Sequence, residues 1–326
     1  MAQILTYSGK ALEQKVSFED GNGRKRDLDV YIPSSELINA VNLTIQLKKR
    51  PLLLMSEPGC GKTRLAEAVA YELHKEKMYE HYFRWDIKST SKAKDGIYRY
   101  DALSRLHDVN LGDRAKKDVN DLNNYIEKGK LARAFTEPQN SNLPNILLID
   151  EIDKADIDFP NDLLLEIENK SFNISELGEQ GELQATSNVI IFITSNQEKE
   201  LPSAFLRRCL FHLIEFPDIS RLKQIVQEHI QSVENDQIDK ALEIVSDIRN
   251  KLDETDKKPS TSELIDWFTM LDYYHQLSIE KPAPEDRTPS ENELIAQLDS
   301  LDKNKVPYKQ ILLKTAEVKY KTEDDS

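Results

Sequence analysis

Glycine and cysteine are both scarce in this sequence. The 326 residues include 10 glycines, and two of these, Gly59 and Gly61, lie in one short segment. The two cysteines, Cys60 and Cys209, are far apart, which excludes a disulfide framework and a zinc-ligand spacing. The 6 histidines form no metal-ligand cluster. This sparse use of thiols is typical of a reducing compartment.

Long apolar runs are also missing. The most apolar stretch, Val189 to Ile193, is far shorter than the roughly 20 residues that a membrane-spanning helix needs. Residues 1–10 lack a basic start followed by an apolar run, so they do not read as a signal peptide. We therefore expect a cytoplasmic protein with no membrane partner.

The charge balance is strongly acidic. With 44 basic and 58 acidic side chains, the formal net charge is −14. A protein that binds a phosphate backbone usually presents a basic face. The acidic total argues against nucleic acid as the main partner. With 39% hydrophobic and 31% charged residues, the chain reads as globular, with room for two or three domains.

A β-hairpin and a helix are predicted near the start of the chain. Apolar and polar residues alternate over residues 15–31, on both sides of Gly21-Asn22-Gly23. Ser34 or Ser35 can cap the helix that follows. Its apolar positions have helical spacing, at Leu37, Val41 and Ile45.

From Arg50 onward, short all-apolar runs alternate with segments long enough for helices. Strands that are covered on both faces have this pattern, because neither side meets water. It predicts an α/β fold with a three-layer αβα core, in which a parallel sheet has helices on both faces. The runs lie at residues 51–55, 146–149 and 189–193, a weaker one lies at 211–216, and residues 82–87 are a further candidate strand.

The strand-like runs stop after Pro217. From about residue 218, apolar residues have helical spacing, which predicts a small all-α domain. Residues 280–292 are rich in proline and charge and read as a surface linker. A last helix is expected to carry Ile311, Leu312 and Leu313.

A phosphate-binding loop is predicted directly after the first apolar run. Residues 56–63 read SEPGCGKT and match the pattern G-x-x-x-x-G-K-[ST], except that Ser56 replaces the first glycine. The two glycines allow the backbone N–H groups to point inward, and the following helix adds its positive dipole end. Lys62 should reach the β- and γ-phosphates of ATP, and the Thr63 hydroxyl should bind Mg²⁺. The predicted nucleotide-binding residues are Glu57, Pro58, Gly59, Cys60, Gly61, Lys62, Thr63 and Arg64. The alternative is a glycine-rich turn with a chance Lys-Thr.

Two adjacent carboxylates directly follow the apolar run at residues 146–149. Residues 146–151 read ILLIDE, and ligands of open α/β sheets lie at the carboxyl ends of the strands. We expect Asp150 to coordinate Mg²⁺ and Glu151 to act as general base toward the attacking water. Asp153 is expected simply to start the next helix, where a negative charge suits the dipole.

Polar and basic residues follow two later runs. Asn196 ends VIIFITSN and is expected to bind the γ-phosphate or the lytic water, although it can also simply turn the chain. Arg207 and Arg208 follow a short predicted helix. One of them is expected to reach a neighbouring subunit's ATP site as an arginine finger. The alternative is that both stabilise the helix C-terminus.

Four motifs stand in order along the chain: SEPGCGKT, ILLIDE, ITSN and LRRC. Together they resemble the AAA+ ATPases. Longer stretches resemble the MoxR-like branch of that class, at residues 95–103, 129–138, 147–169, 193–218 and 259–268. The resemblance covers roughly residues 30–315.

The resemblance implies an enzyme that hydrolyses ATP with Mg²⁺ in rings, usually hexamers, with ATP between subunits. It implies a nucleotide-binding core followed by a helical lid, and an insert hairpin that fits residues 171–187. The expected domains are a hairpin extension at 1–32, the core at 33–217, and the lid and tail at 218–326. Members resemble chaperone-like remodelling motors. They often work with a von Willebrand factor A domain protein, and some belong to bacterial conflict systems.

One departure from the family concerns the lid. Many AAA+ lids carry a sensor arginine at the start of the third lid helix, but residues 259–264 read PSTSEL. Either Lys257 or Lys258 replaces it, or lid closure is sensed through backbone and Ser/Thr contacts.

Two functions remain open on the sequence alone. The first is a ring-forming motor that remodels or activates a protein partner. The alternative is an ATP-dependent assembly switch or scaffold that signals to an effector. A nucleic-acid motor is disfavoured by the acidic charge and by the lack of a recognisable helix-turn-helix or zinc module.

Overall fold

The computed structural model describes residues 5–48, 50–112, 116–139, 143–230, 232–253, 256–292, 296 and 309–312. Its centre is a five-stranded parallel sheet with strand order β11-β3-β10-β7-β4. All five apolar runs predicted from the sequence form these strands. They are β3 (Leu52–Met55), β4 (Tyr82–Asp86), β7 (Asn145–Asp150), β10 (Val189–Ser195) and β11 (Leu210–Leu213).

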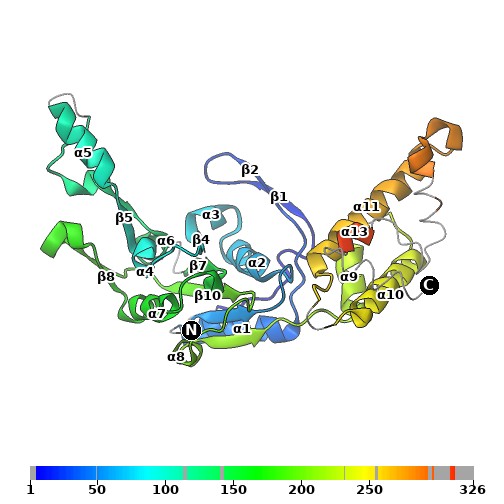
Figure 1. Cartoon of the computed structure of the whole chain (residues 1–326), viewed down its shortest axis with the longest axis horizontal. Coiled ribbons are helices and arrows are strands. Elements are labelled where there is room, and N and C mark those ends of the chain that lie inside the picture. Colours follow the sequence, from blue (N-terminus) through cyan, green and yellow to red (C-terminus); the bar gives the residue numbers. More distant parts are fainter. Residues whose placement is uncertain are drawn as a thin grey trace.

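Helices cover both faces of the sheet, which confirms the three-layer core (Figure 1). One face packs against α1 (Ser35–Leu47), α2 (Lys62–His74) and α3 (Met78–His81). The other packs against α4 (Ala93–Ile97), α6 (Lys130–Thr136), α7 (Phe159–Asn169) and α8 (Ser203–Leu206). Within β3, Leu52 and Leu54 belong to the first cluster and Leu53 to the second, because side chains alternate along a strand.

The predicted N-terminal hairpin is present. Strands β1 (Val16–Glu19) and β2 (Lys25–Leu28) pair antiparallel, with Val16 opposite Leu28. The Phe18 ring lies 5.5 Å from that of Tyr71 on α2, so the hairpin packs over this helix.

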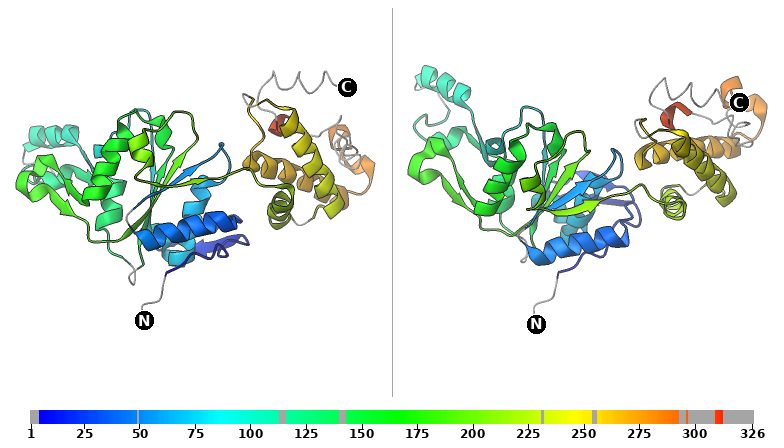
Figure 2. Two further views of the ribbon diagram at one scale, coloured as in Figure 1. Left: turned by 90° about the horizontal axis from the view of Figure 1, so that it is seen from below. Right: turned by 60° about the horizontal axis from the view of Figure 1, so that its bottom comes forward.

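An arm and a second hairpin extend side by side from the α6–α7 side of the core (Figures 1 and 2). The arm contains β5 (Tyr98–Tyr100), α5 (Ala102–Leu111), η3 (Leu122–Tyr125) and β6 (Ile126–Lys128). The hairpin contains β8 (Ser171–Asn173), η5 (Ser175–Gly181) and β9 (Glu182–Gln184), where the insert hairpin was expected. The Tyr98 hydroxyl lies 2.7 Å from that of Ser175, which joins the two.

Helices beyond Pro217 form a separate group (Figure 2). Their apolar side chains pack into a cluster of their own. The helices are α9 (Ile219–His229), α10 (Asn235–Lys251), α11 (Thr261–Glu280) and α13 (Lys309–Leu312), and the short 3-10 helix η6 (Pro284–Asp286) follows α11. Two further 3-10 helices, η1 (Lys75–Lys77) and η4 (Ile152–Lys154), belong to the core. The predicted surface linker at 280–292 contains η6 and a further helical turn that begins at residue 289. Leu313 and the tail lie outside the described residues. Among the described helices, none is long and apolar enough to cross a bilayer.

Candidate active site

The predicted phosphate loop runs from the end of β3 to the start of α2. Gly59 and Gly61 have φ angles of +77° and +82°, in the left-handed region that favours glycine. The Lys62 ammonium donates to the Ser56 carbonyl (3.0 Å), the Ser56 hydroxyl (2.8 Å) and the Glu57 carbonyl (3.1 Å). Ser56 has no positive φ, which explains why a serine is compatible with this position.

Lys62 is a buried cation at the N-terminus of α2. The residue is 7% exposed, and burial lowers the pKa of its ammonium group. Its partners are a hydroxyl and two carbonyls, which offset only part of the lost hydration. A polyphosphate would supply the missing negative charge, so the loop fits ATP.

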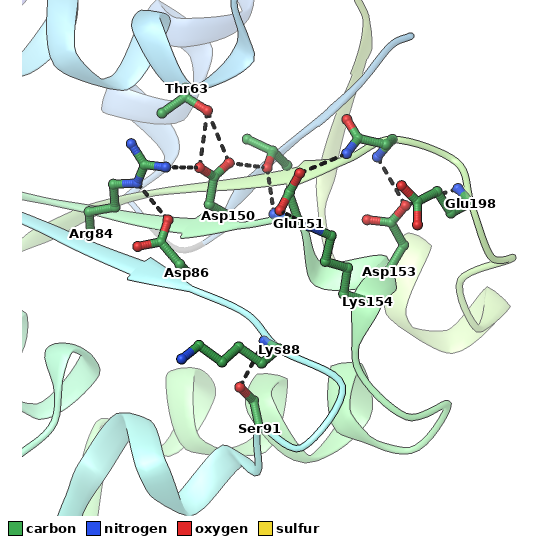
Figure 3. A network of polar contacts seen from close by, with 12 residues as sticks. Thr63, Arg84, Asp86, Lys88, Ser91, Asp150, Glu151, Asp153, Lys154 and Glu198 are labelled. Carbon is green, nitrogen blue, oxygen red and sulfur yellow. Dashed lines mark hydrogen bonds and ion pairs between the residues drawn. The ribbon is translucent and has the colours of Figure 1, made fainter. Parts of the chain in front are cut away.

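Asp150 is held at the end of β7 by side chains from three other elements (Figure 3). The Thr63 hydroxyl on α2 lies 3.1 Å from both carboxylate oxygens. The Thr194 hydroxyl on β10 donates to Oδ1 (2.6 Å), and Arg84 on β4 pairs with Oδ2 (2.9 Å). Thr63 and Asp150 were predicted from the sequence, whereas Arg84 and Thr194 were not.

The Thr63 hydroxyl and the Asp150 carboxylate together fit Mg²⁺. Both are hard oxygen ligands, and Mg²⁺ is usually bound through one or two carboxylates plus substrate phosphates. When bound there, Mg²⁺ would neutralise charge that develops on the phosphate oxygens. The hydrogen bond from the Thr63 hydroxyl on α2 to the Asp150 carboxylate on β7 holds both oxygen ligands near the phosphate loop.

Glu151 follows in a strained backbone conformation. Its φ is +60°, in the left-handed region, which costs a non-glycine residue about 1 kcal/mol. Its N–H donates to the Thr194 hydroxyl (2.8 Å), and its Oε1 accepts from the Asn196 amide (3.0 Å). Lys154 donates to its other oxygen. The carboxylate is thus directed by its neighbours and is half-exposed, as a base toward water needs to be.

Asp153 lies in the first turn of a helix, as expected, but this is the short 3-10 helix η4. The longer helix α7 begins only at Phe159. Asp153 is 2% exposed, and its Oδ2 accepts the N–H groups of Asn196 (3.0 Å) and Glu198 (2.9 Å). It therefore ties the turn after β7 to the turn after β10 and sets the place of Asn196.

Arg207 and Arg208 are both exposed and lie far from the phosphate loop of their own chain. They directly precede β11, which runs parallel to β3, so they lie near the amino-terminal ends of these strands, whereas the loop follows the carboxyl-terminal end of β3. Four strand residues at about 3.3 Å each separate the two ends by about 13 Å. Arg208 pairs with Glu168 of α7 at 3.2 Å. The structure therefore does not bring these arginines to Lys62 or Glu151.

A cavity of about 960 Å³ opens beside the phosphate loop. This is within the usual size of a small-molecule site. Of the predicted nucleotide-binding residues, Gly59, Cys60, Gly61 and Arg64 line it, whereas Glu57, Pro58, Lys62 and Thr63 do not. Apolar walls come from the segment before α1, the end of β11 and the lid, at Tyr31, Ile32, Ile214, Phe216 and Ile265. These walls suit an adenine ring next to bound phosphates.

Comparison with known proteins agrees with this geometry. Residues 52–218 match the model of the ATPase family associated with various cellular activities (AAA), which is just over half of the chain. The chain belongs to the AAA family. It therefore carries an ATP-hydrolysing domain that uses ATP with Mg²⁺.

Two curated relatives are similar over a larger part of the chain. The ATP-dependent zinc metalloprotease YME1L of Drosophila melanogaster is 28% identical over 236 residues, covering 70% of this chain and 27% of that protein. The Proteasome-associated ATPase of Actinosynnema mirum is 26% identical over 222 residues, covering 66% of this chain and 34% of that protein. The chain spans about a third or less of these relatives.

Lys62→Ala is expected to weaken ATP binding by a factor of about 100, because truncation removes the buried cation that meets the phosphates. Binding of a fluorescent ATP analogue measures this directly. Lys77→Ala is the matched control, since Lys77 is exposed in the turn after α2. Normal affinity of Lys62→Ala would show that ATP phosphates bind elsewhere.

Proposed function

We propose that this protein is a MoxR-like motor that assembles into a ring and hydrolyses ATP between neighbouring subunits, in order to remodel or activate a protein partner. The observation that carries the proposal is the position of Arg207 and Arg208. They are exposed near the amino-terminal ends of the strands, whereas the phosphate loop lies at the carboxyl-terminal ends, so they can complete an ATP site only in another subunit. A finger supplied in this way is a recurring part of phosphoryl-transfer sites.

The proposed division is a hairpin extension at 1–32, a nucleotide-binding core at 33–217, and a lid with its tail at 218–326. The separate apolar cluster of the lid helices supports a lid that packs as its own unit. The ring is proposed to be a hexamer, in the cytoplasm, as the MoxR-like resemblance and the sparse cysteines suggest.

A protein is the proposed partner. Both relatives are named for ATP-dependent work linked to proteolysis, which supports a protein substrate over a nucleic acid. The MoxR-like resemblance supports a von Willebrand factor A domain protein. The net charge of −14 also disfavours a phosphate backbone.

A second candidate is an ATP-dependent assembly switch with slow turnover. It is favoured by the contacts of Glu151, whose two carboxylate oxygens are both held, one by Asn196 and one by Lys154. A switch would use these two contacts to hold the carboxylate away from the attacking water. Such a switch would hydrolyse ATP only after a partner changes these contacts.

Steady-state ATP hydrolysis per protomer, measured with Mg²⁺ over a wide range of protein concentration, separates the two candidates. We expect the specific rate to rise with concentration, because assembly brings arginines to each phosphate loop. A rate that stays flat and near zero, although nucleotide binds, would support the switch. A high rate at all concentrations would mean that a single chain holds a complete site.

A further inference from the structure

The start of the lid helix α11 lies directly on the phosphate loop. Ser262 donates twice to the Gly59 carbonyl, from its N–H (3.2 Å) and from its hydroxyl (3.0 Å). A Cβ atom at residue 59 would lie 2.5 Å from the Ser260 hydroxyl oxygen. Glycine is therefore needed at residue 59 for this close approach as well as for its positive φ.

These hydrogen bonds fix the orientation of one peptide unit of the loop. The Gly59 carbonyl and the Cys60 N–H belong to the same peptide group, which is planar and trans. In such a group the C=O and N–H bonds point in opposite directions. By holding the Gly59 carbonyl, the lid directs the Cys60 N–H away from α11, and phosphate oxygens in such a loop need backbone N–H donors.

A second lid residue contacts the same loop from helix α10. The guanidinium of Arg249 lies 3.6 Å from the centroid of the Phe216 ring, and its side chain is only 12% exposed. One of its nitrogens pairs with the Glu57 carboxylate at 3.2 Å, and another donates to the Pro259 carbonyl. Arg249 thus links the lid, the core–lid connection and the phosphate loop.

The two lysines suggested as substitutes for the missing lid arginine behave differently. Lys257 is half-exposed and precedes α11, and its ammonium lies 3.8 Å from the carboxylate of Glu263 in the first turn of that helix. Lys258 forms no ion pair within the described part of the chain. The contacts between lid and loop come instead from Ser262, which fits the suggested Ser/Thr and backbone contacts, and from Arg249, which the sequence did not indicate.

We propose that Arg249 and Ser262 are positioning residues that couple lid closure to the shape of the phosphate loop. They would take the place of the arginine that is absent from residues 259–264. Arg249 acts through Glu57, and Ser262 acts through the Gly59 carbonyl, so neither needs to touch the nucleotide. The inference rests on the proposed ATPase function and adds the route by which the lid senses the site. When the lid moves away, Glu57 and Gly59 lose their donors together, and the orientation of the Cys60 N–H is no longer fixed.

The test compares Glu57→Gln, Arg249→Gln and the double variant in the full chain. We expect each single variant to raise the KM for ATP about three- to tenfold with little change in kcat, because the loop is less well ordered before ATP binds. The double variant should be no worse than the poorer single one, since both remove the same ion pair. Amide hydrogen exchange of residues 57–61 should become faster in all three.

Lys223→Gln is the matched control. It breaks the ion pair between Lys223 and Asp239 (2.6 Å), which lies wholly within the lid. This variant should keep the KM for ATP and the exchange rate of the loop. Glu57→Gln separates positioning from a purely structural role, because it leaves Arg249 stacked on Phe216 and bonded to Pro259.

Wild-type KM and loop exchange in both single variants would overturn the proposal, as would strictly additive effects in the double variant. If Arg249→Gln does not fold, Glu57→Gln and Ser262→Ala still decide, since both leave Arg249 in place. Failure of the wild-type chain to bind ATP would refute the proposed function itself. Wild-type binding with unaffected variants would refute only the lid coupling.

Discussion

Removing both arginines after α8 is expected to slow ATP hydrolysis by a factor of about 10³ or more, with ATP still bound. In the double variant Arg207→Ala and Arg208→Ala, the phosphate loop and the adjacent carboxylates of Asp150 and Glu151 are unchanged in each chain. The transition state, however, would lose the cation that we propose the neighbour supplies to balance its charge. Steady-state hydrolysis and binding of a fluorescent ATP analogue, measured on the same samples, separate the two effects.

The single variants should differ. Arg208 already pairs with Glu168 at 3.2 Å, whereas Arg207 makes no side-chain hydrogen bond or ion pair within the described residues. We therefore expect Arg207→Ala to slow hydrolysis more than Arg208→Ala. Arg24→Ala, an exposed arginine at the turn of the N-terminal hairpin, is the control and should hydrolyse ATP at the normal rate.

Mixed assemblies test whether the arginines act in trans. Subunits with both arginines replaced keep an intact phosphate loop, and Lys62→Ala subunits keep intact arginines. Mixing the two inactive proteins should restore hydrolysis, because some interfaces then combine an intact loop with intact arginines. If the doubly substituted protein hydrolyses ATP normally, or if mixed assemblies form without regaining activity, the finger assignment is wrong.

The strands of the core were predictable because burial on both faces leaves an unambiguous pattern. The run Ile146–Ile149 is fully buried, and the polar Asp150 ends it where the strand meets the site. The phosphate loop was predictable for a similar reason, since its chemistry needs glycine, lysine and threonine at fixed spacing. In both cases the signal lies within a few consecutive residues.

The contacts between strands were not predictable, because they depend on sheet order. Arg84 reaches Asp150 only because β4 lies beside β7, and Thr194 does so because β10 lies on the other side. In the sequence, Arg84 reads as the outward-facing residue of an alternating strand. Thr194 reads as one more β-branched residue in a buried run. A sequence without a known strand order gives neither residue its partner.

Arg249 and Asp153 were missed because each has an ordinary local explanation. A basic residue in the last turn of a helix suits the helix dipole, so the sequence around Arg249, near the end of α10, does not indicate a contact with the phosphate loop. An acidic residue at the start of a helix has the same kind of explanation, and so the contacts of Asp153 with the turn after β10 were not expected. Their actual partners, Glu57 and the turn at Asn196, are 192 and 43 residues away.

Glu151→Gln is expected to retain ATP binding while turnover falls by a factor of about 10² to 10⁴, the usual contribution of a positioned base. Glutamine has the same shape, and its oxygen can still accept the hydrogen bond from the Asn196 amide, now 3.0 Å from Glu151. The amide cannot take a proton from water, however. Its contact with Lys154 also changes, because the ion pair is lost. The site would therefore keep its geometry and lose its proposed base.

An ATP-loaded assembly should accumulate in this variant. Single-turnover hydrolysis measures the loss of the chemical step, and size-exclusion chromatography with ATP measures the trapped assembly. Glu198→Gln is the control, because Glu198 is an exposed carboxylate whose contact with Asp153 is made by its backbone N–H. Rapid turnover by Glu151→Gln would mean that another group activates the water. Asp153 would then be the first residue to test, because its Oδ1 is buried without a hydrogen-bond partner.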